Sequence, residues 1–122
     1  VREEMGSVCK KPFLSVISDS PRVHMREENI TEIEGGMAVI LCDIDTNPLE
    51  NLTVIWYRDN KELEVDGERM LSDITLTDDG HYAVLDILYA NRHDVGLYSC
   101  AVENSVGLGY SEDSTILDVY CK

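Results

Sequence analysis

The sequence predicts an all-β protein, built as a sandwich or barrel of antiparallel sheets. Five segments are rich in β-branched and aromatic residues, at residues 38–44, 52–57, 82–88, 97–102 and 114–120. Turn signals such as EGG, DTNP, VDGE and TDDG separate these segments. No helical pattern persists over about 11 residues, and YANRHDV is expected to form a single helical turn at most.

Length and charge restrict the class of protein. With 122 residues the chain is long enough for one domain with a real core. Its formal net charge of −14 repels phosphate backbones and anionic lipid headgroups, so we expect no nucleic-acid partner, whereas a cationic partner stays open. The longest apolar run, MAVILC, is far shorter than the ~20 residues of a membrane span, so this fragment is not expected to insert into a membrane.

Alternation along the strands assigns side chains to faces, because successive residues of a strand point to opposite sides. The first segment places Cys42 on a face with its apolar neighbours, the second points Trp56 inward, and the fourth points Cys100 inward. These three residues can therefore share one core. The opposite faces of the second and fourth segments carry Ile55, Tyr57, Leu97, Ser99 and Ala101.

Cys42, Trp56 fourteen positions later, and DVGLYSC ending at Cys100 resemble the signature of the immunoglobulin superfamily over residues 21–120. The short segment KELEV after the tryptophan strand makes the chain similar to the I-set type. The phrases PRVHMREENITEIEGG and TVIWYRDNKEL resemble those of nephrin-like recognition receptors among cell-adhesion proteins. The resemblance implies an immunoglobulin-like antiparallel β-sandwich over residues 21–122.

The resemblance also implies roles for the core residues. Cys42 and Cys100 are expected to form the inter-sheet disulfide, which closes a loop of 58 positions and stabilises the fold by about 4 kcal/mol in the chain-entropy model. Tyr98 is expected to be the tyrosine corner, with its hydroxyl bonded to the backbone near the turn before it. Asp94 is expected to be buried and paired with Arg69.

The stretch HDVGLYSC holds residue types of a catalytic triad, but their arrangement argues against chemistry. Ser99 points away from Cys100 and has no base on its own strand. His24, His81 and His93 fall in different segments without metal-ligand spacing, and the acidic clusters lack the pattern of a calcium loop. We therefore expect no enzyme, no metal and no cofactor.

Two further cysteines lie outside the family signature. We expect residues 1–20 to form an N-terminal extension with an extra strand, stapled to the domain by a Cys9–Cys121 disulfide. KPFLSVIS has strand character and SDSP is suited to a reversing turn, with the first strand of the domain beginning at Pro21. The rival interpretations are a leftover strand of a preceding domain, or cysteines that pair with another chain.

Two sequons, at Asn29 and Asn51, together with an even number of cysteines favour the secretory pathway and glycosylation. The predicted function is a non-catalytic, extracellular immunoglobulin domain of a tandem receptor, which binds a protein partner in cell adhesion or recognition and adjoins neighbouring immunoglobulin domains. The candidate interaction face contains Ile55, Tyr57 and Leu97. The alternatives are a structural spacer and an intracellular muscle-type I-set domain.

Overall fold

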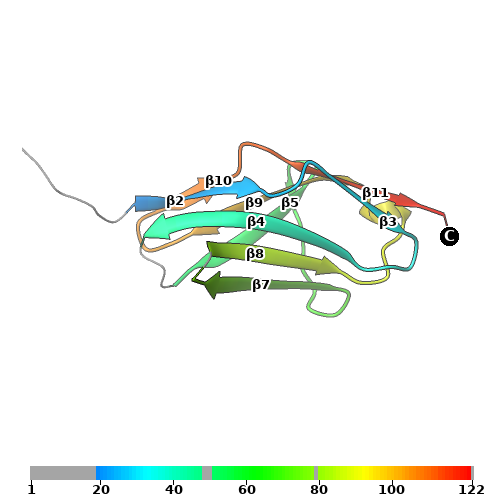
Figure 1. The fold of residues 1–122 in the computed structure, drawn as a ribbon, viewed down its shortest axis with the longest axis horizontal. Helices are drawn as coiled ribbons and strands as arrows, with labels where there is room; N and C mark the ends of the chain where they lie inside the picture. Colours follow the sequence, from blue (N-terminus) through cyan, green and yellow to red (C-terminus); the bar gives the residue numbers. More distant parts are fainter. Residues whose placement is uncertain (1–18, 48–50, 79, 122) are drawn as a thin grey trace, which may run out of the picture.

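The computed structural model describes residues 19–47, 51–78 and 80–121 of the chain. Within these ranges the strands form two sheets that pack face to face (Figure 1). The four-stranded sheet has the order β2 (Asp19–Met25), β4 (Ala38–Asn47), β8 (Gly80–Ile87) and β7 (Met70–Thr77). The six-stranded sheet has the order β3 (Asn29–Ile33), β11 (Thr115–Tyr120), β9 (Gly96–Glu103), β5 (Thr53–Arg58) and β6 (Lys61–Glu62), and β10 (Leu108–Tyr110) pairs with β9.

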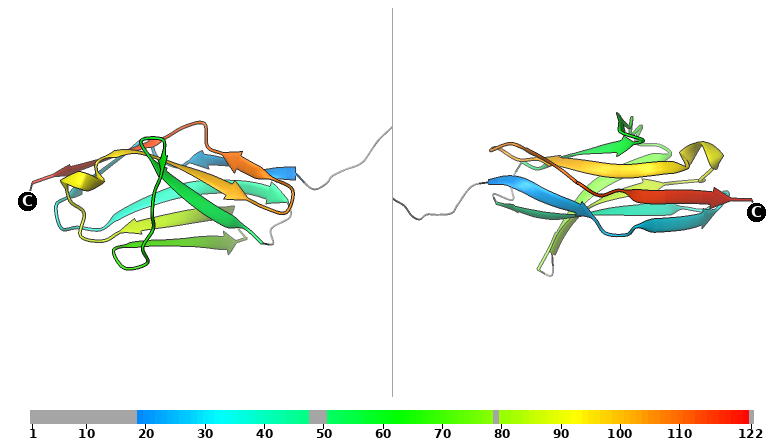
Figure 2. Two further views of the ribbon diagram at one scale, coloured as in Figure 1. Left: turned by 180° about the vertical axis from the view of Figure 1, so that it is seen from behind. Right: turned by 90° about the horizontal axis from the view of Figure 1, so that it is seen from above.

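The predicted all-β sandwich is confirmed, and the five strands predicted between residues 38 and 120 are all present. Seen from behind, β5 crosses in front of β4 and β8, so the two sheets form separate layers (Figure 2). The short segment after the tryptophan strand becomes the two-residue β6, and the YANRHDV segment contains one 3₁₀ turn, η2 (Arg92–Asp94).

One strand pair departs from the predicted antiparallel arrangement. β3 runs parallel to β11, with Asn29 opposite Ile116 and Ile33 opposite Tyr120. The cause is a crossover, because the chain leaves β2 in one sheet and joins the edge of the other sheet without reversing direction. Two hydrogen bonds hold this crossover, from the Thr115 hydroxyl to the Glu27 carbonyl (2.5 Å) and from the Ile116 N–H to the Glu28 carbonyl (2.8 Å).

The core lies between the sheets and follows the predicted faces. Cys42 and Cys100 are fully buried and disulfide-bonded across the two layers. Trp56 lies opposite Cys100 in the β5–β9 ladder and is 1% exposed. The other large buried side chains include Ile40, Leu85, Ile87, Tyr98, Val102 and Leu117. Because apolar burial is the main favourable term in folding, this layer of side chains stabilises the sandwich.

The first strand begins earlier than the sequence predicts. β2 starts at Asp19, so Asp19 and Ser20 belong to a strand and not to the reversing turn expected at SDSP. The expected extra strand lies outside the described residues. The added part of the strand pairs with β4, where Asp19 lies opposite Asn47. β2 also approaches β10 closely, because a Cβ added to Gly109 would meet the carbonyl of Pro21. The glycine thus lets β2 lie against the β9–β10 hairpin.

Candidate interaction face

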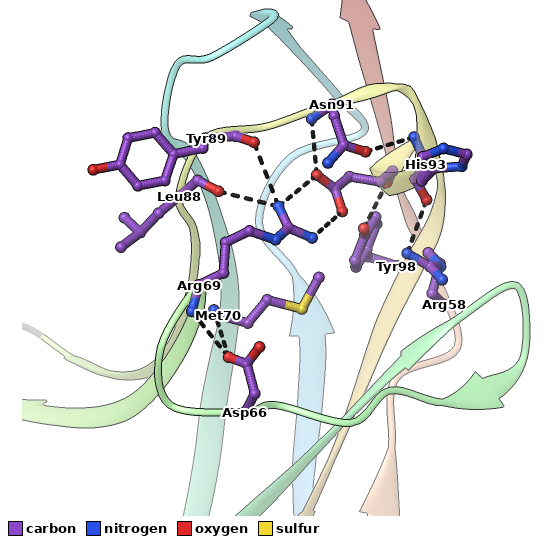
Figure 3. Close-up of polar contacts among 10 residues, drawn as sticks. Arg58, Asp66, Arg69, Met70, Leu88, Tyr89, Asn91, His93 and Tyr98 are labelled. Carbon is purple, nitrogen blue, oxygen red and sulfur yellow. Dashed lines mark hydrogen bonds and ion pairs between the residues drawn. The ribbon is translucent and has the colours of Figure 1, made fainter.

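The stretch HDVGLYSC, residues 93–100, contains residue types of a catalytic triad but forms a structural corner at the start of β9. The Tyr98 hydroxyl donates to the carbonyl of Asp94 (2.5 Å) and is buried. The Arg69 guanidinium (Figure 3) donates to both carboxylate oxygens of Asp94, at 2.9 and 2.7 Å. The expected ion pair and tyrosine corner are therefore both found in the structure.

The Asp94 carboxylate is only 1% exposed, and its surroundings favour the charged form. Burial by itself raises the pKa of Asp94, but the hydrogen bonds from Arg69 and from the Asn91 N–H hold the pKa below its usual value. The Asn91 side chain in turn accepts from the His93 N–H, which completes a capping box around η2. This carboxylate holds a turn and has no freedom to act on a substrate.

Other polar anchors were missed by the sequence analysis. Asp66 accepts hydrogen bonds from the N–H groups of Glu68, Arg69 and Met70, which lowers the pKa of its carboxyl. The Trp56 indole donates to the Ser72 hydroxyl (2.9 Å). Ser72 shares a face of β7 with the apolar residues Met70, Ile74 and Leu76, and a serine among them was the available signal for this partner.

No catalytic or metal-binding arrangement is found in the described part of the chain. His24, His81 and His93 lie on β2, on β8 and in η2. Across the described ranges, no three His, Cys, Asp or Glu side chains gather as metal ligands would. Likewise, no helix among the described residues has the length and apolar character needed to cross a membrane.

The outward side of the six-stranded sheet carries an apolar surface, which we call the outer apolar face. It consists of Ile55, Tyr57, Leu97, Ala101, Tyr110, Ile116 and Tyr120. Four of these side chains are strongly exposed, namely Leu97 (45%), Ile116 (45%), Tyr120 (52%) and Tyr110 (60%). Isolated exposed apolar residues are ordinary, but a group of this kind on adjacent strands marks a candidate interaction site.

Strand register brings the three predicted face residues into this group. Leu97 lies opposite Ile116, and Ile55 lies opposite Ala101, which in turn faces Tyr110 in the β9–β10 pair. Ala101 points outward as predicted but is fully buried, because its side chain is small and has Ile55 and Tyr110 as cross-strand neighbours.

Tyr57 and Tyr110 form the aromatic part of the face. Their ring centroids lie 6.1 Å apart with an interplanar angle of 50°, a tilted contact of a kind that aromatic pairs favour. Burial and the neighbouring Tyr110 raise the pKa of Tyr57, so its hydroxyl stays neutral at physiological pH. The sequence did not predict Tyr110 as part of the face because Gly107 and Gly109, which lie on either side of Leu108, have no side chains to show the alternation of β10.

The two sequons differ in their relation to this face. Asn29 is exposed on β3 and lies opposite Ile116, whereas Asn51 is exposed in the loop before β5. Asn51 adopts a positive φ of 59°, a conformation that asparagine tolerates better than most residues. Both side chains are accessible to solvent, so glycosylation at Asn29 and Asn51 stays a prediction that the geometry permits.

The structure describes only one cysteine of the second predicted disulfide. Cys121 follows β11 with an exposed free thiol, 3.7 Å from the Nη2 atom of Arg92. Its predicted partner Cys9 lies outside the described residues. β2 begins at the opposite end of the domain from the end of β11 (Figure 1), so residues 10–18 would have to run back along its length. The Cys9–Cys121 bond stays a prediction.

Comparison with known proteins agrees with this geometry. Residues 21–119 match the model of the immunoglobulin I-set domain. The chain is 37% identical over 87 residues (71% of the chain) to titin of Drosophila melanogaster, and 30% identical over 112 residues (90% of the chain) to hemicentin-2 of Mus musculus. It is 27% identical over 85 residues (70% of the chain) to the synaptogenesis protein syg-1 of Caenorhabditis elegans. Each match spans only a small share of the relative's own length: 0% (to the nearest per cent) of titin, 2% of hemicentin-2 and 11% of syg-1.

Solved structures show the same fold. The complex of Dpr2 Ig1-Ig2 with DIP-Theta Ig1-Ig3 contains a chain with a TM-score of 0.70 at 17% identity, covering 93% of this chain and 35% of that one. The BTLA ectodomain has a TM-score of 0.70 at 19% identity, covering 84% of this chain and all of that one. The match of residues 21–119 to the family model, in agreement with the disulfide, the tryptophan and the tyrosine corner, shows that the chain belongs to the immunoglobulin I-set family, whose domains are non-enzymatic.

Proposed function

We propose that this domain is an extracellular recognition module that binds a protein partner through the outer apolar face in cell adhesion or cell recognition. The observation that carries the proposal is the exposed apolar group on adjacent strands, with Leu97 and Ile116 paired and Tyr57 and Tyr110 in ring contact. Tyrosines in a well-packed, desolvated centre are common anchors of an interface, and the surrounding apolar contacts exclude water from them.

The disulfide and the relatives support this proposal. A cystine between Cys42 and Cys100 is stable in an oxidising compartment, which agrees with an extracellular location. Among the relatives, syg-1 is named a synaptogenesis protein, and the Dpr2–DIP-Theta structure is a complex between two immunoglobulin chains. A role in protein binding therefore agrees with the names of these similar proteins.

The test is an interaction screen of the 122-residue chain, displayed in multivalent form, against an array of cell-surface ectodomains. Leu97→Glu and Tyr57→Ala should abolish binding to any partner found. Leu71→Glu is the matched control, because Leu71 is a comparably exposed apolar residue (40%) on the other sheet. Retained binding by both face variants would exclude this face as the site.

A structural spacer is the second candidate function. β2 begins at one end of the sandwich and β11 ends at the other (Figure 1), an arrangement that adds length when domains follow one another in a chain. The discriminating experiment deletes this domain from its host protein and replaces it with an unrelated immunoglobulin domain of similar length. Full recovery of partner binding by the replacement would favour the spacer.

A further inference from the structure

Within the described strands, the charged side chains on the outer apolar face's side of the sheet have one sign. On the outward side of the six-stranded sheet, the charged strand residues are Glu62, Glu103 and Asp118. Asp59 adds a fourth carboxylate at the end of β5, where it accepts from the Leu97 N–H (3.0 Å). Among the described strand residues that point outward here, none is Lys, Arg or His.

The basic residues near this sheet lie elsewhere. Arg58 and Lys61 form a cross-strand pair on the other side of the β5–β6 ribbon from Tyr57 and Glu62. The Arg58 guanidinium donates to the His93 carbonyl (3.0 Å), beside the Arg69–Asp94 corner (Figure 3). These cations therefore do not neutralise the carboxylates of the outer apolar face.

The outer side of the four-stranded sheet provides an internal comparison. There Arg26 pairs with Asp43 at 2.6 Å and stacks over the Tyr82 ring, 4.8 Å from its centroid. His24 also lies 3.4 Å from Asp43. This second face mixes both signs of charge although the chain as a whole carries −14. The single sign around the outer apolar face is thus a local feature and not a mere reflection of the net charge.

A symmetric contact between two copies would bring this face against itself. In such a contact every residue meets a surface of identical composition, so each carboxylate would face carboxylates, apolar side chains or neutral polar side chains, but no cation from the described strands. Like charges that meet across an interface cost several kcal/mol, and a desolvated charge opposite an apolar group has no compensation. Self-association through the outer apolar face is therefore disfavoured by its own charges.

We propose that the outer apolar face binds a different protein, whose docking surface has an apolar centre and a rim of Lys or Arg side chains, and not a second copy of this chain. The inference rests on the proposed function, which it makes specific. Lys or Arg opposite Glu62, Glu103 and Asp118 would direct the encounter and set the orientation, while the Leu97–Ile116 and Tyr57–Tyr110 pairs would provide the apolar contact.

The test introduces the positive charges of the proposed partner into this protein itself. In the triple variant E62K/E103K/D118K, the face keeps its apolar centre but gains a basic rim. Sedimentation analysis of the wild-type chain, of the variant, and of their mixture should then show a 1:1 complex in the mixture at concentrations at which neither chain alone self-associates. We expect the mixed complex to bind about tenfold more tightly than either self-complex, and to weaken as ionic strength rises.

Two controls separate this outcome from general attraction between opposite charges. D45K/D78K/D86K changes the net charge by the same amount on the four-stranded sheet and its turn, and it should not pair with the wild type. Leu97→Glu, introduced into both members of the mixed pair, should abolish the complex because it places a charge in the apolar centre.

Three results would overturn the inference: wild-type self-association that Leu97→Glu abolishes, a mixture no tighter than the wild type alone, or equal pairing by the control triple variant. None of these depends on the ectodomain screen. A mixed complex without any partner in the screen would count against the proposed function alone. A partner that binds E62K/E103K/D118K as tightly as it binds the wild type would count against the basic rim alone.

Discussion

Arg69 and Asp94 form a two-pronged ion pair that joins the start of β7, in one sheet, to the turn before β9, in the other. The two partners differ in burial, since the Arg69 side chain is 33% exposed and the Asp94 side chain 1%. Their loss should therefore have unequal consequences, because the carboxylate cannot reach water while the guanidinium can.

Arg69→Ala should destabilise the domain by about 3 kcal/mol at pH 7, near the lower end for a broken buried pair because Arg69 is partly solvated. In the wild type, the lowered pKa of Asp94 gives a stability that is present above its unfolded pKa of about 3.9 and is lost as pH falls through the folded pKa. Without Arg69, burial raises that pKa, so acid should relieve the strain on the variant.

Urea unfolding at a series of pH values measures this difference. The gap in unfolding free energy between the wild type and Arg69→Ala should be widest at pH 7 and should shrink below about pH 4. Arg22→Ala, at an exposed position of β2, is the matched control and should give a small, pH-independent difference. A constant gap for Arg69→Ala would show that Asp94 is not the group that Arg69 stabilises.

The close approach of β2 to β10 makes a second prediction. Gly109→Ala should cost about 1–3 kcal/mol, because the added Cβ meets the Pro21 carbonyl, a backbone atom that cannot move without shifting β2. Gly107→Ala is the control, since its Cβ would meet the Ser20 side chain and not a backbone atom. Denaturant midpoints of the two variants measure the contrast, and equal midpoints would contradict the role of Gly109.

Local patterns predicted most of the fold because they report burial. The alternation around Cys42, Trp56 and Cys100 identified inward faces, and the structure places these residues in one core. The Arg69–Asp94 pair followed from the family resemblance and is found as expected. The residue types agree with this pairing, since a buried charge needs a partner of opposite sign.

The remainder depends on register and crossover, which alternation does not encode. The parallel β3–β11 pair follows from a change of sheet at residues 26–28, where no apolar pattern marks the event. Tyr110 and Ile116 join the outer apolar face only because β10 and β11 flank β9 at a particular register. Asp66 likewise stabilises the turn before β7 by accepting hydrogen bonds from backbone N–H groups. Every residue type except proline has such a group, so the side chains that follow Asp66 do not reveal this contact.

The state of the cysteines distinguishes the cellular compartments. For an extracellular protein with the predicted staple, a mass map without reduction should show Cys42–Cys100 and Cys9–Cys121 as linked peptides and no free thiol. Alkylation of both Cys9 and Cys121 in the native protein would refute the second disulfide and leave Cys121 as the free thiol of the structure. Four alkylated cysteines in protein from its natural source would instead favour an intracellular domain.

The sequon at Asn29 predicts control of the outer apolar face by glycosylation. Asn29 is exposed and lies opposite Ile116, which is paired with Leu97, so a glycan there would stand within about one or two strand spacings of the apolar centre. The bulk and hydration of the glycan should then hinder docking over β3 and β11 while leaving Tyr57 and Tyr110 accessible.

Secretion from mammalian cells provides the test, with peptide masses reporting glycan occupancy. Asn29→Gln should remove one glycan and tighten the mixed complex of wild-type and E62K/E103K/D118K faces by about tenfold, when both members carry the change. Asn51→Gln, in the loop before β5, should remove a glycan without changing the affinity. If Asn29 carries a glycan and Asn29→Gln does not change the affinity, docking is confined to the side of the face formed by β5, β9 and β10.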